Sequence, residues 1–138
     1  MSTLQSIPTL LRSHGLRVTP QRLAVAELVL EKPIHITART AYETLRSAHP
    51  AISMNTIYLT LGQFESSGLL SRFEVGGNTV FDSNTSPHHH AFCKRCKAII
   101  DLNDEQKELP RLPAALEHWH IDHEQRILSG TCPQCIEI

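Results

Sequence analysis

Four cysteines in two pairs constrain the fold of this chain more than any other feature. Cys93 and Cys96 form one C-x-x-C motif, and Cys132 and Cys135 form a second. Each motif presents two thiolates on one turn, and two such turns complete the tetrahedral sulfur cage that zinc prefers. Because sulfur fills all four positions and leaves none for a reactant, the spacing predicts a zinc ion that stabilises structure and does no chemistry.

The alternative for paired cysteines is a redox motif or a disulfide. A lone C-x-x-C after a strand of a thioredoxin-like fold would favour redox chemistry, and this sequence offers no such context. The first residues lack the pattern of a signal peptide, and no apolar run approaches the roughly 18 residues of a membrane span. We therefore expect a cytoplasmic chain with no membrane partner. Thiols stay reduced in the cytoplasm, which favours metal binding over disulfides.

The length of 138 residues allows two small domains. A domain below about 70–80 residues usually needs a metal, disulfides or a partner chain to stabilise it, and all four cysteines follow residue 92. The polar, turn-rich stretch 84–87 is typical of a domain boundary. We expect domains over residues 1–83 and 84–138, the second of them stabilised by the metal.

Helical signals fill most of the first domain. Apolar residues recur at helical spacing within residues 4–11. Thr19, Thr37 and Ser53 each precede a further apolar helical pattern and can accept the first free N–H groups of a helix. These signals predict four helices.

After the fourth helix the pattern changes to that of a hairpin. Residues 69–75 and 78–82 read as strands on either side of Gly76 and Gly77. Helices followed by a small hairpin are typical of a winged helix-turn-helix. Beyond the boundary we expect strands near residues 91–92, 98–102 and 124–128, and a helix within 104–118. The predicted fold class is α+β: an N-terminal winged helix-turn-helix followed by a small α/β domain with a four-cysteine zinc site.

Histidines and aspartates gather around the first cysteine pair. In an extended segment His88 and His90 project to one face, and His89 projects to the other. Asp82 ends the predicted hairpin, and Asp101 lies shortly after the first motif. A mixed nitrogen and oxygen set suits iron(II), manganese(II) or zinc. The spacing by itself is equally compatible with a solvated histidine loop.

Three segments together resemble the ferric uptake regulator family: residues 15–22 (GLRVTPQR), 53–61 (SMNTIYLTL) and 88–96 (HHHAFCKRC). They stand in the family's order, and the resemblance covers nearly the whole chain. It implies a homodimeric, metal-dependent repressor, not an enzyme, that binds palindromic operator sites in double-stranded DNA through two winged-helix domains. Residues 84–138 would then form the dimerisation and metal-binding domain.

The resemblance also implies the metal ligands. The four cysteines match the family's structural zinc ligands. The positions that match its regulatory site, which would hold Fe2+ or Mn2+ with Zn2+ also possible, are His35, Asp82, His88, His90 and Asp101.

Two of these positions bear on the branch of the family. Asp101 resembles the peroxide-responsive branch, because iron-uptake regulators typically carry glutamate there. Asp82 stands where zinc-uptake regulators tend to place a cysteine. In the peroxide-responsive branch the residues matching His35 and His88 are oxidised when peroxide meets the iron-loaded site. An iron-uptake or a zinc-uptake repressor is the alternative.

An additional metal site of some relatives is only partly matched here. The chain lacks histidine at two of the corresponding positions, which weakens the expectation. The candidate ligands for this additional site are His89, Glu108, His123 and Glu124.

The DNA contacts are expected on the fourth helix and on nearby arginines. A formal net charge of −1 is not that of a strongly basic nucleic-acid binder, so local positive charges must contact phosphate. Leu59 stands where relatives often carry arginine, so the base contacts there should differ. The candidate contact residues are Arg17, Arg22, Ser53, Asn55, Thr56, Tyr58, Thr60 and Gln63.

An enzyme and a zinc-stabilised interaction module are the competing classes. A catalytic metal keeps an open position beside a substrate pocket, whereas five candidate ligands surround the predicted regulatory ion. The capped fourth helix and the glycine-turned hairpin argue against a module that never binds DNA.

Overall fold

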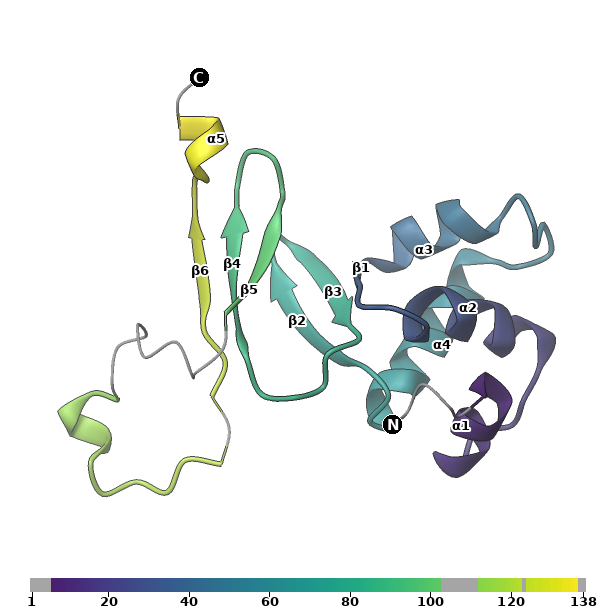
Figure 1. The fold of residues 1–138 in the computed structure, drawn as a ribbon, viewed down its shortest axis with the longest axis horizontal. Coiled ribbons are helices and arrows are strands. Elements are labelled where there is room, and N and C mark those ends of the chain that lie inside the picture. The colour runs from purple at the N-terminus through teal and green to yellow at the C-terminus, as the bar shows by residue number, and fades with distance from the viewer. Residues whose placement is uncertain (1–5, 103–111, 123, 137–138) are drawn as a thin grey trace. The chain divides into compact units, whose positions relative to one another are not determined.

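The computed structural model describes residues 6–102, 112–122 and 124–136. The chain divides into two compact units, residues 1–85 and 86–138 (Figure 1). The division falls within the polar stretch 84–87. Each unit contains one small three-stranded sheet.

Four helices begin the N-terminal unit, and each starts at a side-chain cap. Ser6, Thr19, Thr37 and Ser53 each accept a hydrogen bond from the backbone N–H three residues further on, a bond that typically stabilises a helix by about 1 kcal/mol. The last three caps confirm the sequence prediction. The helices are α1 (Ile7–Ser13), α2 (Pro20–Leu30), α3 (Ala38–Leu45) and α4 (Met54–Ser66).

Helix α4 supplies the centre of the core of this unit. Ile57, Leu61 and Phe64 recur at the spacing of one helix face, and all three are fully buried. They pack with Leu11 of α1 and Val25 of α2 in one hydrophobic cluster. The opposite face of α4 is therefore held outward.

A three-stranded antiparallel sheet completes the unit. Its strands are β1 (His35–Ile36), β2 (Ser71–Val75) and β3 (Asn78–Asp82), in the order β1-β3-β2. Gly76 and Gly77, with φ of 58° and 80°, form the hairpin turn, because both central positions of a type I′ turn need positive φ. The hairpin was predicted, and the two-residue strand β1 was not. The helices and the hairpin confirm the winged helix-turn-helix.

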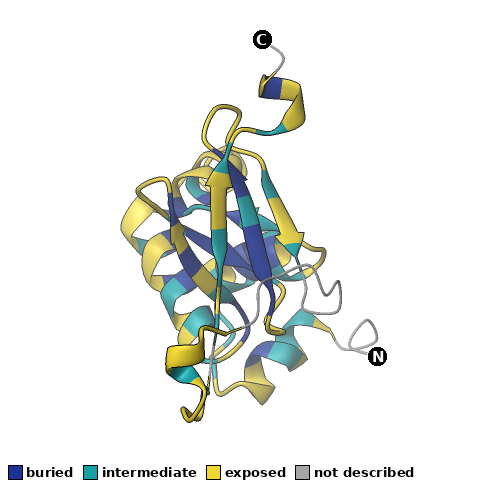
Figure 2. Ribbon diagram, turned by 90° about the vertical axis from the view of Figure 1, so that its left-hand side faces the viewer, coloured by how far each residue is buried: buried dark blue, intermediate teal, exposed yellow. Residues whose placement is uncertain are grey.

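The C-terminal unit is built on a second small sheet. Strands β4 (His89–Cys93), β5 (Ile99–Leu102) and β6 (Ile127–Gly130) are ordered β5-β4-β6, with β4 antiparallel to β5 and parallel to β6. The central strand is the most buried of the three (Figure 2).

Three details of this unit differ from the expectation. The third strand begins at Ile127, later than the predicted 124–128. Helix α5 (Pro133–Ile136), which contains Cys135 and directly follows Cys132, was not predicted. The expected helix within 104–118 appears in the described residues 112–118 only as a 3-10 turn, η3 (Ala114–Leu116), and residues 104–111 lie outside the described part of the chain. No helix among the described residues is long and apolar enough to cross a membrane.

Candidate metal centres and the exposed face of helix α4

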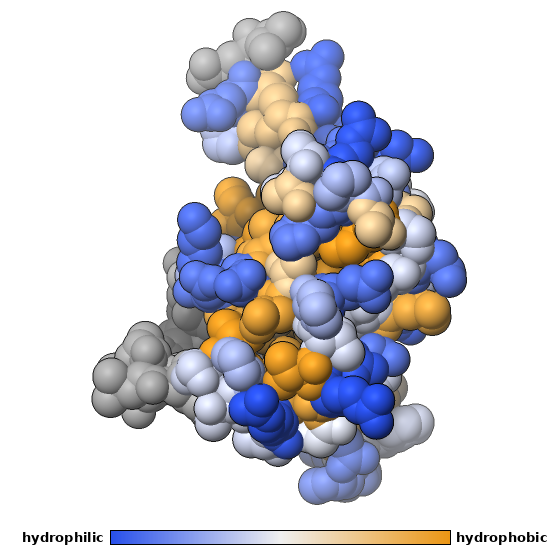
Figure 3. Space-filling view, turned by 90° about the vertical axis from the view of Figure 1, so that its right-hand side faces the viewer, coloured by the Kyte–Doolittle hydropathy of each residue, from blue (hydrophilic) through white to orange (hydrophobic). Residues whose placement is uncertain are grey.

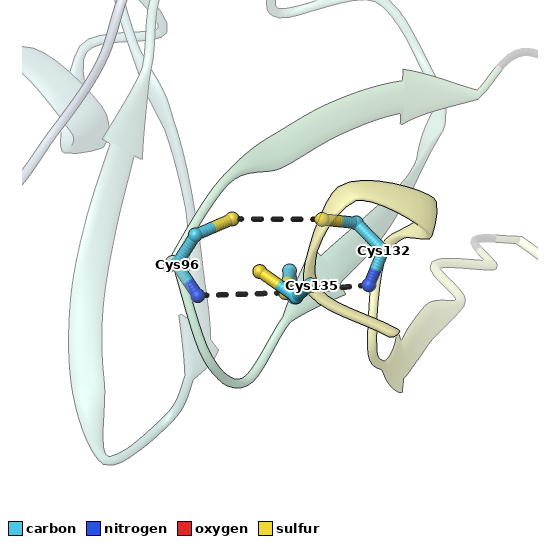
Figure 4. A group of neighbouring side chains, drawn as sticks. Cys96, Cys132 and Cys135 are labelled. Carbon is cyan, nitrogen blue, oxygen red and sulfur yellow. Dashed lines mark hydrogen bonds between the residues drawn. The ribbon is translucent and has the colours of Figure 1, made fainter. Parts of the chain in front are cut away.

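The two C-x-x-C motifs come together in the C-terminal unit. Cys93 ends β4 and Cys96 lies on the turn that leads to β5, while Cys132 directly precedes α5 and Cys135 lies within it. One sulfur from each residue lies within 4.8 Å of the other three. The Sγ atoms of Cys96 and Cys132 face each other at 3.8 Å (Figure 4).

This geometry matches the size of a tetrahedral zinc site. Two sulfur atoms that are each about 2.3 Å from zinc, at the tetrahedral angle, lie about 3.8 Å apart. All four cysteines are free thiols in this structure, so their closeness does not come from disulfide bonds. The four-cysteine cluster is therefore consistent with a structural zinc site.

Two thiols of this cluster, Cys93 and Cys135, have pKa values shifted in opposite directions. The N–H groups of Cys132 and Cys96 point at Cys93 Sγ from 3.4 and 3.5 Å, and these contacts lower the pKa of the Cys93 thiol to about 6. The side chain of Cys132, together with burial, raises the pKa of Cys135 to about 12. One thiolate is thus favoured at neutral pH, while its neighbour keeps a proton that an incoming cation would displace.

Arg95, which was not among the predicted site residues, connects the two motifs by a hydrogen bond. Arg95 Nη1 donates a hydrogen bond to the carbonyl oxygen of Cys135 at 2.8 Å. The turn ends at Lys97 in a left-handed conformation, with φ of 67°, and its Nζ donates to the Lys94 carbonyl oxygen at 2.8 Å. A charged residue at either x position of such a motif usually faces solvent, so no sequence signal points to the Arg95 bond.

A second group of ligand-type side chains lies at the other end of β4. Asp101 faces His90 across the β4–β5 pair. The Nε2 atoms of His88 and His90 are each 3.5 Å from the same atom, Asp101 Oδ1. Two ligands about 2.1 Å from a tetrahedrally coordinated ion lie about 3.4 Å apart, so the spacing fits a shared ion.

The orientation of His88 is set by a backbone group. Its Nδ1 lies 2.6 Å from the carbonyl oxygen of Ser86. A carbonyl oxygen only accepts, so Nδ1 carries the proton and Nε2 keeps the lone pair that a metal needs. This contact pre-arranges His88 as a ligand through Nε2.

His89 lies on the other side of the strand, as its alternation with His88 and His90 predicts. Its Nδ1 accepts a hydrogen bond from the Arg126 backbone N–H at 2.9 Å, and its Nε2 is 3.9 Å from Glu124. Glu124 also pairs with the Arg126 side chain at 2.9 Å. These contacts give His89 a structural role that links β4 to the start of β6. Glu108 and His123, the other candidates for an additional metal site, lie outside the described residues.

The N-terminal unit holds its own histidine and carboxylate pair. His35 on β1 and Asp82 on β3 are register partners, and His35 Nε2 lies 3.4 Å from Asp82 Oδ2. The carboxylate is 2% exposed, and its Oδ1 accepts the backbone N–H of Asn84 at 2.9 Å. Strand β1 therefore positions His35, which the sequence analysis had placed by resemblance.

The expected DNA contacts divide into exposed and engaged side chains. Arg17, Asn55, Tyr58 and Gln63 are exposed. Thr60 corrects the prediction: its side chain is 4% exposed, because it belongs to the buried face of α4.

Three further candidates, Ser53, Thr56 and Arg22, have side chains that make hydrogen bonds within the unit. Ser53 Oγ is occupied as the α4 cap by the Thr56 N–H. Arg22 is half-buried, donates from Nε to Gln63 at 3.2 Å and donates from Nη1 to the Arg17 carbonyl oxygen at 2.9 Å. Arg22 thus links α2 to α4 and presents a fixed positive charge beside that helix.

Comparison with known proteins identifies relatives across most of the chain. The model of the "Ferric uptake regulator family" matches residues 13–126. The "Peroxide-responsive repressor PerR" of Staphylococcus aureus (strain Mu50) is 33% identical over 127 residues, which cover 91% of this chain and 86% of that protein.

Two solved structures are also similar to this chain over most of its length. The ferric uptake regulator of Vibrio cholerae is 32% identical with a TM-score of 0.73, over 92% of this chain and 100% of that one. The ferric uptake regulator of Pseudomonas aeruginosa, solved with manganese, is 25% identical with a TM-score of 0.69, over 94% and 99%.

Proposed function

The chain belongs to the ferric uptake regulator family of metal-responsive transcriptional regulators, and from this premise we propose that it is a repressor that releases its operator DNA on exposure to peroxide. It is a regulator and not an enzyme. The observation that carries the proposal is the pair of histidine Nε2 atoms held at equal distance from one oxygen of Asp101.

The first part of the proposal concerns the regulatory ion. Each unit offers an incomplete ligand set: an imidazole and a carboxylate in the N-terminal unit, two imidazoles and a carboxylate in the C-terminal unit. Neither set fills a coordination sphere alone, and their nitrogen and oxygen donors suit Fe2+ or Mn2+, with Zn2+ also accepted. We propose that one ion takes all five ligands: His35, Asp82, His88, His90 and Asp101.

A shared ion would turn metal binding into a change of domain geometry. Metal-binding free energy would select the arrangement in which both ligand sets reach the ion. In a dimer that arrangement sets the distance between the two copies of α4, which must match half-sites about one helical turn of DNA apart, or a multiple of it. Metal loss would free the units and weaken operator binding.

An exposed apolar row supports the homodimer. Ala91 pairs with Ile100 on one side and with Leu128 on the other, so the three side chains lie in a line across the second sheet. Ile100 and Leu128 are 56% and 51% exposed, and they line one apolar hollow. A second copy of the chain would bury this row, so Leu128→Glu should convert a dimer to a monomer in light scattering.

The peroxide response rests on the identity of the ligands. Iron(II) held by this set would supply electrons for the reduction of hydrogen peroxide beside the ligand imidazoles. His35 and His88 are the residues proposed to gain an oxygen atom on the ring. An oxidised ring is a poorer ligand, so the shared ion would no longer hold the two units in one arrangement.

An iron-uptake repressor is the second candidate. The V. cholerae ferric uptake regulator matches this chain as well as the peroxide-responsive relative does, at 32% against 33% identity. The aspartate at position 101 favours the peroxide response. The aspartate at position 82 likewise argues against a zinc-uptake role.

The test is DNA binding by the metal-loaded protein with and without peroxide. We expect the iron-loaded form to lose its operator after peroxide and the manganese-loaded form to keep it. Mass spectrometry should find one added oxygen on the peptides that contain His35 or His88. Peptides with the exposed His14 serve as the internal control and should stay unmodified.

Two outcomes would change the proposal. Iron-loaded protein that keeps its DNA and shows no oxidised histidine would transfer the assignment to the iron-uptake role. DNA binding that does not depend on Fe2+, Mn2+ or Zn2+ would contradict the proposal of a regulatory ion.

A further inference from the structure

Helix α4 carries an unusual outer face for a helix that stands in water. Met54, Tyr58 and Leu59 are 39%, 50% and 57% exposed. They lie in the N-terminal half of the helix: Leu59 points away from the buried face of Ile57 and Leu61, and Met54 and Tyr58 lie beside that face. The solvent side of a surface helix is normally polar. The exposed apolar positions therefore indicate a contact that the isolated chain does not make.

Leu59 is the most exposed of the three and has no polar atom in its side chain. Its neighbours line two hollows on the surface. One contains Arg17, Arg22, Thr56 and Gln63, and the other contains Leu16, Tyr58 and Arg72. Figure 3 shows one face of the molecule, on which some apolar side chains reach the surface among hydrophilic ones. Leu59 is thus an apolar side chain beside the cationic pair Arg17 and Arg22.

The cationic groups indicate which partner covers this face. Arg17 is exposed, Arg22 is fixed by its bonds to Gln63 and to the Arg17 carbonyl oxygen, and the exposed Arg72 lies 3.7 Å from the Glu65 carboxylate of α4. The positive charges of Arg17 and Arg22 beside the helix suit the phosphate backbone that borders a major groove. A second protein chain with an apolar surface would gain nothing from them. DNA is therefore the occupant that accounts for both the charges and the leucine.

The chemistry of the groove then restricts what Leu59 can recognise. Base edges in the major groove present hydrogen-bond donors and acceptors, which a leucine cannot pair, and one apolar group, the 5-methyl of thymine. The first turns of a recognition helix are those that approach base edges, and Leu59 lies in that half of α4. A leucine packed against a polar base edge would leave that edge without a partner.

We propose that Leu59 is a specificity-determining residue that reads the 5-methyl group of one thymine in each operator half-site. This inference rests on the proposed function, since it requires α4 to enter the major groove. It goes beyond that function by requiring a thymine at one position of each operator half-site and by assigning this preference to Leu59.

The test removes the methyl group without changing base pairing. A preferred duplex is first selected from a random library with the full-length, manganese-loaded protein. Each thymine is then replaced in turn by deoxyuridine, and the dissociation constant is measured. We expect one position per half-site at which the replacement weakens binding about three- to fivefold, the effect of burying one methyl group.

The variant Leu59→Ala completes a double-mutant cycle. At the sensitive position, Leu59→Ala should bind the thymine and deoxyuridine duplexes equally well, because the methyl group has lost its partner. The substitution is at an exposed site, so folding should be unaffected. Leu112→Ala, another exposed leucine but outside α4, is the matched control and should keep full sensitivity to deoxyuridine.

The outcomes separate this inference from the function on which it rests. Selective, metal-dependent binding that is insensitive to every deoxyuridine replacement would overturn the role of Leu59 and leave the repressor intact. A Leu59→Ala protein that keeps the sensitivity would overturn that role as well. Failure to select any duplex with any metal would overturn both the role and the proposed function.

Discussion

His90 and Asp101 lie directly opposite each other on β4 and β5, with Nε2 of the histidine 3.5 Å from Oδ1 of the aspartate. The same oxygen is 3.5 Å from Nε2 of His88. Antiparallel pairing thus brings together two imidazoles and a carboxylate from residues that are separated in sequence by the first cysteine motif. The strand register, and not the histidine run alone, makes a ligand set.

Replacing Asp101 by asparagine should weaken binding of the regulatory ion. The substitution keeps the shape of the side chain and removes the negative charge that both histidines face. We expect the affinity for Mn2+ to fall at least about tenfold. The measurement is a calorimetric titration of protein that carries zinc only in the four-cysteine site. Asp122→Asn, at an exposed carboxylate in the same unit, should leave the affinity unchanged. Equal Mn2+ affinity in wild type and Asp101→Asn would exclude this carboxylate as a ligand.

Replacing Cys96 by serine should release the structural zinc and destabilise the C-terminal unit. A bound zinc ion stabilises the folded form that presents its four ligands, and few apolar side chains in the described part of this unit are buried. We expect zinc content by mass spectrometry to fall from one ion per chain toward none, with a lower midpoint of the thermal transition. Lys94→Ala in the same turn is the control. A Cys96→Ser protein that kept both zinc and its transition would disprove the four-sulfur site.

The metal-free protein should lose a specific part of its stability on acidification. The folded pKa of Cys93 is about 6, below the roughly 8.5 of a cysteine in an unfolded chain. A lowered pKa stabilises the fold above the unfolded value, and that contribution disappears as the pH falls through the folded value. The relevant window is therefore from about pH 8.5 down to about pH 6.

Urea unfolding of the metal-free protein measures this effect. The stability difference between wild type and Cys93→Ala should be largest near pH 8.5 and should shrink toward pH 6. The variant also removes packing, but that loss does not depend on pH. A difference that stayed constant across the window would contradict the stabilised thiolate.

The predictability of the fold depended on how local each signal was. The caps at Thr19, Thr37 and Ser53 act over three residues, so they could be read directly. Strand β1 is two residues long, and His35 enters it only because β3 offers a pairing edge. That contact joins residues far apart in sequence, which no local pattern encodes.

The predictability of the candidate sites also depended on whether each signal was local. The cysteine spacing specified the sulfur cluster, because a C-x-x-C turn is itself a local structure. The bond from Arg95 to the Cys135 carbonyl oxygen and the buried position of Thr60 depend on tertiary packing. Thr60 was misjudged because the polar residues of α4 were all assigned to its outer face.

His89 provides the last prediction, because its structural and metal-binding roles have opposite consequences. The Arg126 backbone N–H donates to His89 Nδ1, which leaves the ring proton on Nε2 beside Glu124. Removing the imidazole would leave a half-buried N–H without its acceptor, at a cost of about 1–3 kcal/mol. We therefore expect His89→Ala to lower the urea midpoint of the zinc-loaded protein while the number of metal ions bound per chain stays the same. The exposed His118→Ala should change neither quantity. A His89→Ala protein of unchanged stability that binds one ion fewer would show that this histidine is a ligand after all.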